Sequence, residues 1–364
     1  MPAPDRAGAV LEVDLAAIVA NWWLLCALHP SGPVAGVVKA DGYGLGAREV
    51  AAALYAAGCR HFFVALLDEA LAIRDLVPEA MLAVLGGLIA GSERDYLAHG
   101  IVPVLGSLAE IDAWATAARR LGIALPAMLH VDTGMSRLGL DARELASLQQ
   151  DHARLEGLDL RYVMTHLVAS EVASDPLNQT QRDRFAAACA GLPAARRSFA
   201  NSSGIFLGDG WRSDLARPGA ALYGINPTPG APNPMHAAVR LRARVLAVRE
   251  VPAGSGVGYN STWRAVRPSR IVTAAIGYAD GLHRSLSNRG QAFFDGKPVP
   301  LVGRVSMDLT TFDATEVSGM VAGTWLEVIG PEQTPDDLAV AAGTNGYEVL
   351  TSLGRRFHRI YKPA

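Results

Sequence analysis

The sequence predicts an α/β protein in which an N-terminal (β/α)8 barrel of the TIM type is followed by a mostly-β C-terminal domain. Over the first two-thirds of the 364 residues, short apolar runs alternate with helical patterns about eight times, which matches the length and rhythm of such a barrel. After about Pro234, residues Val239–Val245 alternate strictly between apolar and charged side chains. A period of two is typical of a strand with one face in solvent. The length of the chain also exceeds that of a usual single core, so two domains are expected.

The barrel is predicted from eight candidate strands with helical stretches between most of them. Ser107–Leu121 is an example of a predicted helix, because its apolar residues recur on one face. Since a repeat of strands and helices does not show that a sheet closes, an open doubly wound sheet is the alternative, and the length favours the barrel. The candidate strands are Val34–Lys39, His61–Leu66, Met81–Leu85, Ile101–Leu105, Pro126–Val131, Leu160–Thr165, Arg197–Ala200 and Arg212–Arg217.

The C-terminal domain is predicted from strands separated by turns that contain glycine and proline. The expected strands are Val239–Val245, Arg270–Ile276, Pro300–Asp308 and Thr324–Ile329. Pro227–Pro234, which holds four prolines and a glycine, is the expected linker. We therefore divide the chain into a barrel over residues 1–234 and a β domain over residues 235–364.

Composition excludes several classes of protein. Half of the residues are hydrophobic and 19% are charged, which describes a packed globular protein. A net charge of -2 gives no reason to expect nucleic acid or an anionic membrane as a partner. Three separate cysteines form no metal-binding spacing, so no metal site is expected. The polar segment Met1–Gly8 and the interrupted apolar segment after it fit neither a signal peptide nor a membrane span, and we expect a cytoplasmic protein.

Lys39 is the first candidate for chemistry. It ends the apolar run Val34–Val38 and so lies at the C-terminal mouth of a predicted barrel strand, where barrel enzymes place their active sites. Desolvation at such a position lowers the pKa of an amine, which lets it form a Schiff base. Taken alone, Lys39 is more simply an exposed lysine at a strand end. Other motifs along the chain favour the catalytic interpretation.

Eight motifs, in order along nearly the whole chain, resemble those of the alanine racemases, which are pyridoxal-phosphate-dependent enzymes of fold type III. One such motif would be a weak signal, but eight in the same order are a strong one. The motifs are Val38–Gly44, Asp132–Gly139, Thr165–Leu167, Ala200–Ser202, Arg217–Gly224, Gly277–Gly281, Gly303–Asp308 and Gly346–Glu348.

The resemblance implies that the barrel binds pyridoxal 5'-phosphate and that the chain forms a head-to-tail homodimer with shared active sites. Lys39 would hold the cofactor aldehyde. Arg137 would bond its phenolic oxygen and also meet the substrate, while His166 and Asn201 would line the site. The resemblance assigns the phosphate to Tyr43, Ser202, Gly219, Ala220 and Tyr347. Residues 202 and 219–220 follow the seventh and eighth predicted strands, which form the usual phosphate corner of a barrel.

Arg217 corresponds to the arginine that faces the pyridine nitrogen of the cofactor. A guanidinium stays protonated and only donates hydrogen bonds. Facing that nitrogen, it should leave the ring unprotonated and the cofactor a weaker electron sink, which suppresses side reactions such as transamination. A strand-end arginine in a surface ion pair is the alternative. For His166, an ordinary packed imidazole is as good an interpretation as a functional one.

Tyr259 corresponds to the second acid/base of the family. Inverting a stereocentre by proton exchange requires one group on each face of the Cα plane, and Lys39 and Tyr259 would serve opposite faces of an external aldimine with alanine. A phenol needs nearby positive charge to act as a base at neutral pH, which His166 and Arg217 would supply. The resemblance places Tyr259 in the partner subunit's site and places Tyr278 and Met307 at the substrate entrance.

Three residues depart from the commoner family pattern. His130 stands where many members have a lysine that becomes carbamylated and supports the arginine at position 137. Asn260 and Ser306 replace a commoner glycine and cysteine. These departures bear on the range of side chains accepted more than on the type of reaction.

The function predicted is therefore the interconversion of L-alanine and D-alanine. The alternative within enzymes is a broader amino-acid racemase of the same fold. The alternative of another class is a pyridoxal-phosphate carrier or homeostasis protein, which would have Lys39 but neither the β domain nor Tyr259. A barrel amino-acid decarboxylase should not require the Tyr259 motif.

Overall fold

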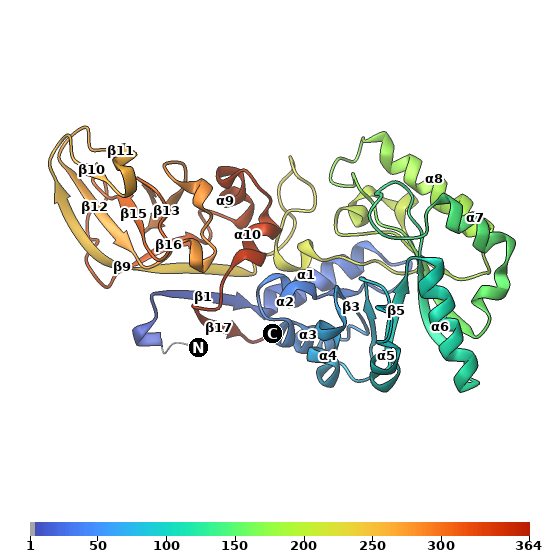
Figure 1. The fold of residues 1–364 in the computed structure, drawn as a ribbon. Helices are drawn as coiled ribbons and strands as arrows, with labels where there is room; N and C mark the ends of the chain where they lie inside the picture. Colours follow the sequence, from blue (N-terminus) through green and yellow to red (C-terminus); the bar gives the residue numbers. More distant parts are fainter. Residues whose placement is uncertain (1–3) are drawn as a thin grey trace.

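The structure, a computed structural model, describes residues 4–364, so the first three residues of the polar segment Met1–Gly8 lie outside it. The chain forms a seven-stranded parallel sheet and an eight-stranded mixed sheet. Figure 1 shows the parallel sheet and its helices at one end of an elongated molecule, with strands β9 to β16 at the other end. Within residues 4–364, no helix combines the length and apolar character that a membrane span requires.

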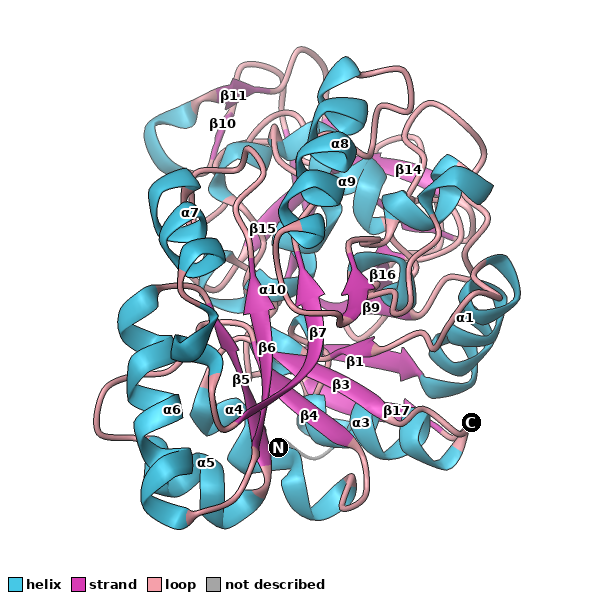
Figure 2. Cartoon of the chain, turned by 90° about the vertical axis from the view of Figure 1, so that its right-hand side faces the viewer, coloured by secondary structure: helices cyan, strands magenta, loops and turns pink. Residues whose placement is uncertain are grey.

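The parallel sheet confirms the predicted order of the barrel strands, because each strand pairs with the next one along the chain. Figure 2 shows several of these strands surrounded by helices. The strands are β2 (Gly36–Val37), β3 (His61–Val64), β4 (Met81–Val84), β5 (Ile101–Leu105), β6 (Leu125–His130), β7 (Leu158–Met164) and β8 (Arg196–Ser198).

The eighth predicted strand, Arg212–Arg217, closes the barrel without forming a regular strand. The Ala35 N–H donates to the Ala216 carbonyl at 2.9 Å, and the Ala216 N–H donates to the Pro33 carbonyl at 3.1 Å. On the other side, the Arg217 N–H donates to the Ala200 carbonyl at 2.8 Å. Pro33 and Pro218 flank this pairing, and a proline has no N–H to extend a ladder. The segment therefore pairs through an isolated bridge.

Alternate residues of these strands fill the barrel interior, as the period of two requires. The interior cluster includes Phe63, Met128, Tyr162 and, from the closing segment, Leu215, all fully buried. Outside the barrel lie α1 (Leu15–Leu28), α3 (Ala47–Ala56), α4 (Leu67–Ile73), α5 (Glu93–His99), α6 (Leu108–Leu121), α7 (Ala142–Gln150) and α8 (Pro176–Ala190).

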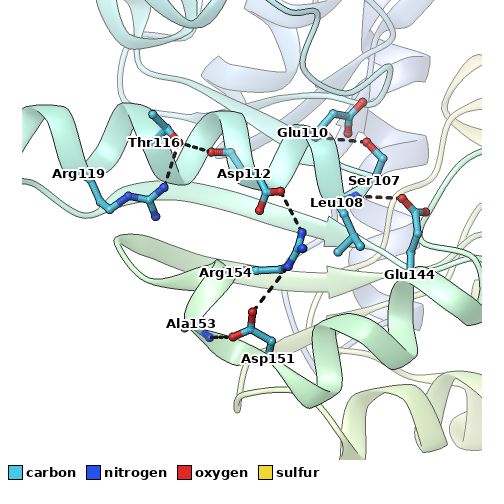
Figure 3. A network of polar contacts seen from close by, with 10 residues as sticks. All are labelled: Ser107, Leu108, Glu110, Asp112, Thr116, Arg119, Glu144, Asp151, Ala153 and Arg154. Atoms are coloured by element: carbon cyan, nitrogen blue, oxygen red, sulfur yellow. Dashed lines mark hydrogen bonds and ion pairs between the residues drawn. The ribbon is translucent and has the colours of Figure 1, made fainter.

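Helix α6 confirms the helix predicted over Ser107–Leu121 to within one residue. The Ser107 hydroxyl caps it by accepting from the Glu110 N–H at 3.3 Å, and Gly122 ends it in the left-handed conformation. Figure 3 shows how polar contacts then tie α6 to the next part of the chain. Arg154 pairs with Asp112 of α6 at 2.9 Å. This network lies on the outside of the barrel and is structural.

The mixed sheet is built around one long strand, β9 (Val239–Val251), which pairs with β1, β12 and β16. The prediction of a strand over Pro300–Asp308 is wrong, because only Pro300, the last residue of β14, belongs to a strand. Gly303 has a φ of 78°, which interrupts an extended strand. The other strands of this sheet are β1 (Ala9–Asp14), β12 (Ser269–Ala274), β13 (Gln291–Phe294), β14 (Lys297–Pro300), β15 (Thr310–Asp313), β16 (Trp325–Ile329) and β17 (His358–Lys362). Strands β10 (Gly256–Val257) and β11 (Trp263–Arg264) pair with each other in a separate two-stranded sheet, and the helices of this part are α9 (Pro335–Ala342) and α10 (Gly346–Ser352).

The N-terminal segment belongs to the mixed sheet although it precedes the barrel in the chain. Strand β1 lies antiparallel to β9 and parallel to β17. Helix α1 follows β1 directly and carries Asn21, which is fully buried. The Asn21 amide donates to the carbonyls of Leu222 and His236 and accepts from the His236 N–H at 2.7 Å. Asn21 thus joins the barrel to the segment that enters β9. The division of the chain at residue 234 remains a prediction.

We expect Asn21→Ala to lower the melting temperature, because it removes the partner of the buried Leu222 carbonyl and of the partly buried N–H and carbonyl of His236. A buried group that loses its partner costs about 1–3 kcal/mol. The measurement is thermal unfolding followed by circular dichroism. The exposed amide of Gln179, whose one partner within residues 4–364 is Asp183, provides the control Gln179→Ala. Equal melting temperatures for the Asn21 and Gln179 variants would contradict this role.

Candidate active site

A cavity of about 400 Å3 opens at the C-terminal ends of the barrel strands. Every residue that the sequence assigns to the cofactor lines it, although these residues come from segments far apart in the chain. Tyr347 reaches the cavity from α10, which lies in the chain between β16 and β17 of the mixed sheet. The residues are Lys39, Tyr43, Arg137, His166, Asn201, Ser202, Arg217, Gly219, Ala220 and Tyr347. Their roles remain predictions, but the fold brings them together.

The segment after Lys39 has an unusual backbone. Residues 40–43 have φ values of 53°, 53°, 61° and 55°, so α2 (Lys39–Tyr43) is mostly one turn of left-handed helix. For L-residues this conformation costs ~1–2 kcal/mol each, and only Gly42 is a glycine. Backbone bonds from the Gly42 N–H to the Val38 carbonyl and from the Gly44 N–H to the Ala40 carbonyl close the turn, at 2.9 and 2.8 Å. The turn allows Lys39 and Tyr43 to line the same cavity.

Lys39 lies among positive charges. Burial lowers the pKa of its amine, and Arg137 and Arg217 lower it further, while Glu69 opposes the shift. The side chains of Lys39 and Arg137 make no hydrogen bond or ion pair with any residue in the range 4–364. An amine with a lowered pKa is more often unprotonated at neutral pH, which is what a nucleophile requires.

One corner of the cavity is lined with hydrogen-bonding groups. The Ser202 hydroxyl accepts from the N–H groups of Gly219 and Ala221, at 3.1 and 3.2 Å. A Cβ on Gly219 would lie 2.0 Å from the Tyr43 hydroxyl oxygen, so only glycine fits there. The Tyr43 ring stacks on Tyr223 with centroids 4.7 Å apart. Burial raises the pKa of Tyr43, so its hydroxyl stays protonated and can donate a hydrogen bond.

Arg217 is buried in the floor of the site. It is 5% exposed and donates to the Ser198 hydroxyl and, at 2.7 Å, to the Thr165 carbonyl. Burial lowers its pKa to about 10, so it stays charged at neutral pH. It has no carboxylate partner among the described residues, which excludes the surface ion pair that the sequence left open.

His166 carries no charge at neutral pH. Burial lowers its pKa to about 3, with further lowering by Arg217, Arg137, Lys39 and His130. The expectation that His166 and Arg217 together supply positive charge is therefore wrong for His166, because a second cation beside buried arginines is disfavoured. Arg217 supplies the charge alone.

Gln181, which the sequence analysis did not identify, supports this part of the site. It is fully buried on α8. Its amide donates to the Thr133 hydroxyl at 3.1 Å and the His166 carbonyl at 2.9 Å, and it accepts from the Val168 N–H at 2.8 Å. The sequence contains a signal for this, because helical spacing places Gln181 on the same buried face of α8 as Phe185 and Ala188. A polar residue on an apolar helix face indicates a buried hydrogen-bonding role.

The other three predicted residues do not line this cavity. Tyr259, Tyr278 and Met307 belong to the C-terminal part and are 68%, 43% and 54% exposed. Tyr278 and Met307 lie on adjoining segments, because the Tyr278 N–H donates to the Ser306 carbonyl and the Ala279 N–H to the Met307 carbonyl, both at 3.0 Å. Strands β10 and β11, which flank Tyr259, lie at the end of the molecule away from the barrel (Figure 1). One chain alone does not bring Tyr259 to Lys39.

The structure shows the surroundings of His130 and Asn260, two of the three residues that depart from the commoner family pattern. His130 is buried and lines a second cavity of about 210 Å3 that Arg137 also lines. Burial and then Arg217 lower its pKa to about 4, so it is a neutral imidazole. Asn260 has a φ of 60°. Asparagine tolerates this left-handed conformation better than most residues other than glycine, which accounts for its standing in place of the commoner glycine.

Comparison with known proteins agrees with these observations over nearly the whole chain. The family model described as "Alanine racemase, N-terminal domain" matches residues 13–227, and "Alanine racemase, C-terminal domain" matches residues 238–361. An alanine racemase of Acidiphilium cryptum is 55% identical over 352 residues, covering 97% of this chain and 98% of that protein. An alanine racemase of Rhodospirillum rubrum is 50% identical over 361 residues, covering 98% and 96%.

Solved structures give the same result. The crystal structure of alanine racemase from Bartonella henselae with covalently bound pyridoxal phosphate has a TM-score of 0.95 and 42% identity, covering 98% of this chain and all of that one. Biosynthetic alanine racemase from Pseudomonas aeruginosa has a TM-score of 0.91 and 34% identity, covering 98% and 99%. The chain belongs to the alanine racemase family.

Proposed function

We propose that this protein is an alanine racemase that interconverts L-alanine and D-alanine with pyridoxal phosphate held covalently by Lys39. The observation that carries the proposal is that one cavity at the barrel mouth collects all ten residues expected around that cofactor. Membership of the family supports the same conclusion. The presence of the β domain argues against a carrier protein, which would lack it.

The residues of the cavity fit this cofactor. Pyridoxal phosphate is an anion, and the cavity is lined by two arginines, Arg137 and Arg217, as well as by Lys39, whereas Glu171 is the one acidic residue among the lining residues described. The corner formed by Tyr43, Ser202, Gly219, Ala220 and Tyr347 supplies hydrogen-bonding groups for the phosphate. The pyridine nitrogen would face Arg217, and the phenolic oxygen would face Arg137.

When bound, pyridoxal phosphate draws electron density from the Cα of an amino acid joined to it and so acidifies the Cα proton. The chain then has to move that proton. The Lys39 amine removes or returns it on one face, and the hydroxyl of Tyr259 acts on the other face. Inversion follows because the two groups lie on opposite sides of Cα. The positive charge of Arg217 assists Tyr259 in acting as a base.

The active site requires a second subunit in this proposal. Tyr259 does not line the cavity of its own chain and is 68% exposed. A head-to-tail homodimer would place Tyr259, Tyr278 and Met307 of one subunit over the barrel mouth of the other. Tyr278 and Met307 would then border the substrate, with Arg137 on the barrel side. A site restricted in this way suits a small side chain such as that of alanine. The cytoplasm remains the predicted location.

The first prediction concerns the cofactor lysine. The chain contains lysines only at positions 39, 297 and 362. Reduction of the holoenzyme with borohydride, followed by peptide mass spectrometry, should place the pyridoxyl group on Lys39, and Lys39→Ala should lose the visible absorption of the bound cofactor. Lys297→Ala, at an exposed strand position, should retain both the absorption and racemisation. A label on Lys297 or Lys362 would contradict the assignment.

The second prediction concerns the shared site. Lys39→Ala and Tyr259→Ala should each be nearly inactive, but a mixed dimer would contain one intact site. Random subunit exchange between equal amounts of the two variants should restore about a quarter of wild-type activity, because half of the dimers are then mixed and each mixed dimer has one of its two sites intact. Each variant incubated alone is the control. Lack of recovery after subunit exchange has been verified by mass spectrometry would show that the site is not shared.

The third prediction separates the two acid/base groups. Tyr259→Phe keeps the ring but removes the proton-transfer group, so racemisation in both directions should fall roughly 10²–10⁴-fold. In deuterated water, NMR should show that D-alanine, the enantiomer assigned to Lys39, still exchanges its Cα proton with retention. L-alanine should exchange far more slowly, whereas the wild type exchanges both. Equal exchange of the two enantiomers by Tyr259→Phe would point to one base serving both faces.

A further inference from the structure

The carboxylate of Glu69 joins two parts of the barrel rim. Glu69 lies in the first turn of α4, and its Oε2 accepts from the N–H groups of Ala65 and Leu66 at 2.7 and 3.1 Å. Its Oε1 accepts from the Ala40 N–H at 2.7 Å. Ala40 is the residue directly after Lys39 and lies 29 positions away from Glu69 in the chain. Bonds from N–H groups to an ionised carboxylate are among the stronger hydrogen bonds in proteins.

The bond to Ala40 is not needed for the helix. A glutamate at the third position of a helix commonly accepts from the N–H groups that precede the first turn, and Oε2 alone does this for α4. Oε1 is directed to a different segment, the turn that carries Lys39. Oε2 therefore stabilises the start of α4, whereas Oε1 contacts the active-site segment.

The segment that receives this bond is the one whose backbone is strained. Ala40 is the first residue of the left-handed turn, with a φ of 53°. Val38, which precedes the turn, provides no side-chain cap. At the far end, the Asp41 carboxylate accepts from the Ala47 N–H at 3.0 Å. Among the residues that the structure describes, Glu69 is thus the side chain that bonds the start of the turn.

Glu69 also affects the charge around Lys39. Burial, Arg137 and Arg217 all lower the pKa of Lys39, and Glu69 is the group that raises it. Its carboxylate therefore moderates a site that is otherwise strongly positive, in addition to its geometric contact.

We propose that Glu69 is a positioning residue for the cofactor: it holds the left-handed turn 40–43 and thereby keeps Lys39 and Tyr43 at the two ends of the bound pyridoxal phosphate. The proposal rests on the proposed function, in which Lys39 holds the aldehyde and Tyr43 the phosphate. Without the Ala40 contact, residues 40, 41 and 43 can relax towards negative φ, and the two side chains then lose their relative placement.

Glu69→Gln tests this in the holoenzyme. An amide has one acceptor oxygen, and its NH2 group repels the N–H donors, so it cannot serve both segments. The affinity for pyridoxal phosphate, measured by the visible absorption regained on titrating the cofactor back after its removal, should fall roughly 10- to 100-fold. Asp68→Asn is the matched control. It removes the same charge from the same helical turn, but Asp68 is exposed and bonds nothing described, so affinity should change less than about twofold.

A second substitution shows whether the effect passes through the turn. Glycine adopts positive φ without strain, so Ala40→Gly combined with Glu69→Gln should recover several-fold of the lost affinity. If Glu69→Gln does not fold, as judged by circular dichroism, Glu69→Asp replaces it, because the shorter side chain keeps the charge but cannot span both segments.

Three results would overturn the proposal. Equal affinities for Glu69→Gln and Asp68→Asn would show that the contact is unimportant. Failure of Ala40→Gly to recover affinity would show that Glu69 does not act through the left-handed turn. If the wild-type protein takes up no pyridoxal phosphate, it shows no visible absorption at all. That result would overturn the proposed function and this inference with it.

Discussion

Closure of the parallel sheet by backbone hydrogen bonds is the constraint on which the site depends. The backbone bonds that Ala216 forms with Ala35 and Pro33 join the first and last members of the barrel, so the carboxyl ends of all the strands meet at one rim. Residues as distant in sequence as Lys39, His166 and Arg217 consequently line a single cavity. In an open sheet the first and last strands would lie at opposite edges, and Lys39 and Arg217 would be separated.

The site also gathers positive charge without neutralising it. Arg217 is buried with hydrogen bonds to a hydroxyl and a carbonyl but without a carboxylate, and Lys39 lies within its field. Burying cations in this way is unfavourable unless an anion completes the site. Both nearby histidines respond by losing their charge, because burial and the arginines lower their pKa values to about 3 and 4. An anionic cofactor such as pyridoxal phosphate offers negative charge to a site of this kind.

The C-terminal part is attached firmly to the barrel, while the side chains that the sequence predicts to be functional there are exposed. Strand β1 lies in the mixed sheet, the next element α1 packs on the barrel, and Asn21 of α1 bonds both the barrel and the segment that enters β9. Tyr259 and Met307, by contrast, are more than half exposed. A rigid link between the two parts would fix where these side chains are presented to a second copy of the chain. Assembly, and not internal folding, would then complete the site.

From the amino-acid pattern alone, we could predict the order of the barrel strands, the helix over residues 107–121, a strand over Val239–Val245 and ten of the residues that line the cavity. These follow from local periodicity and from motifs, which a single segment carries. The strand expected over Pro300–Asp308 was wrong because a positive φ at Gly303 interrupts it, and periodicity does not report backbone conformation. Four features could be identified only in the folded chain: the pairing of β1 with β9, the neutral state of His166, the buried contacts of Gln181 and the bond between Glu69 and Ala40. Each depends on which distant groups surround a residue, and the long-range contacts that set burial, charge and hydrogen bonding exist only once the chain has folded.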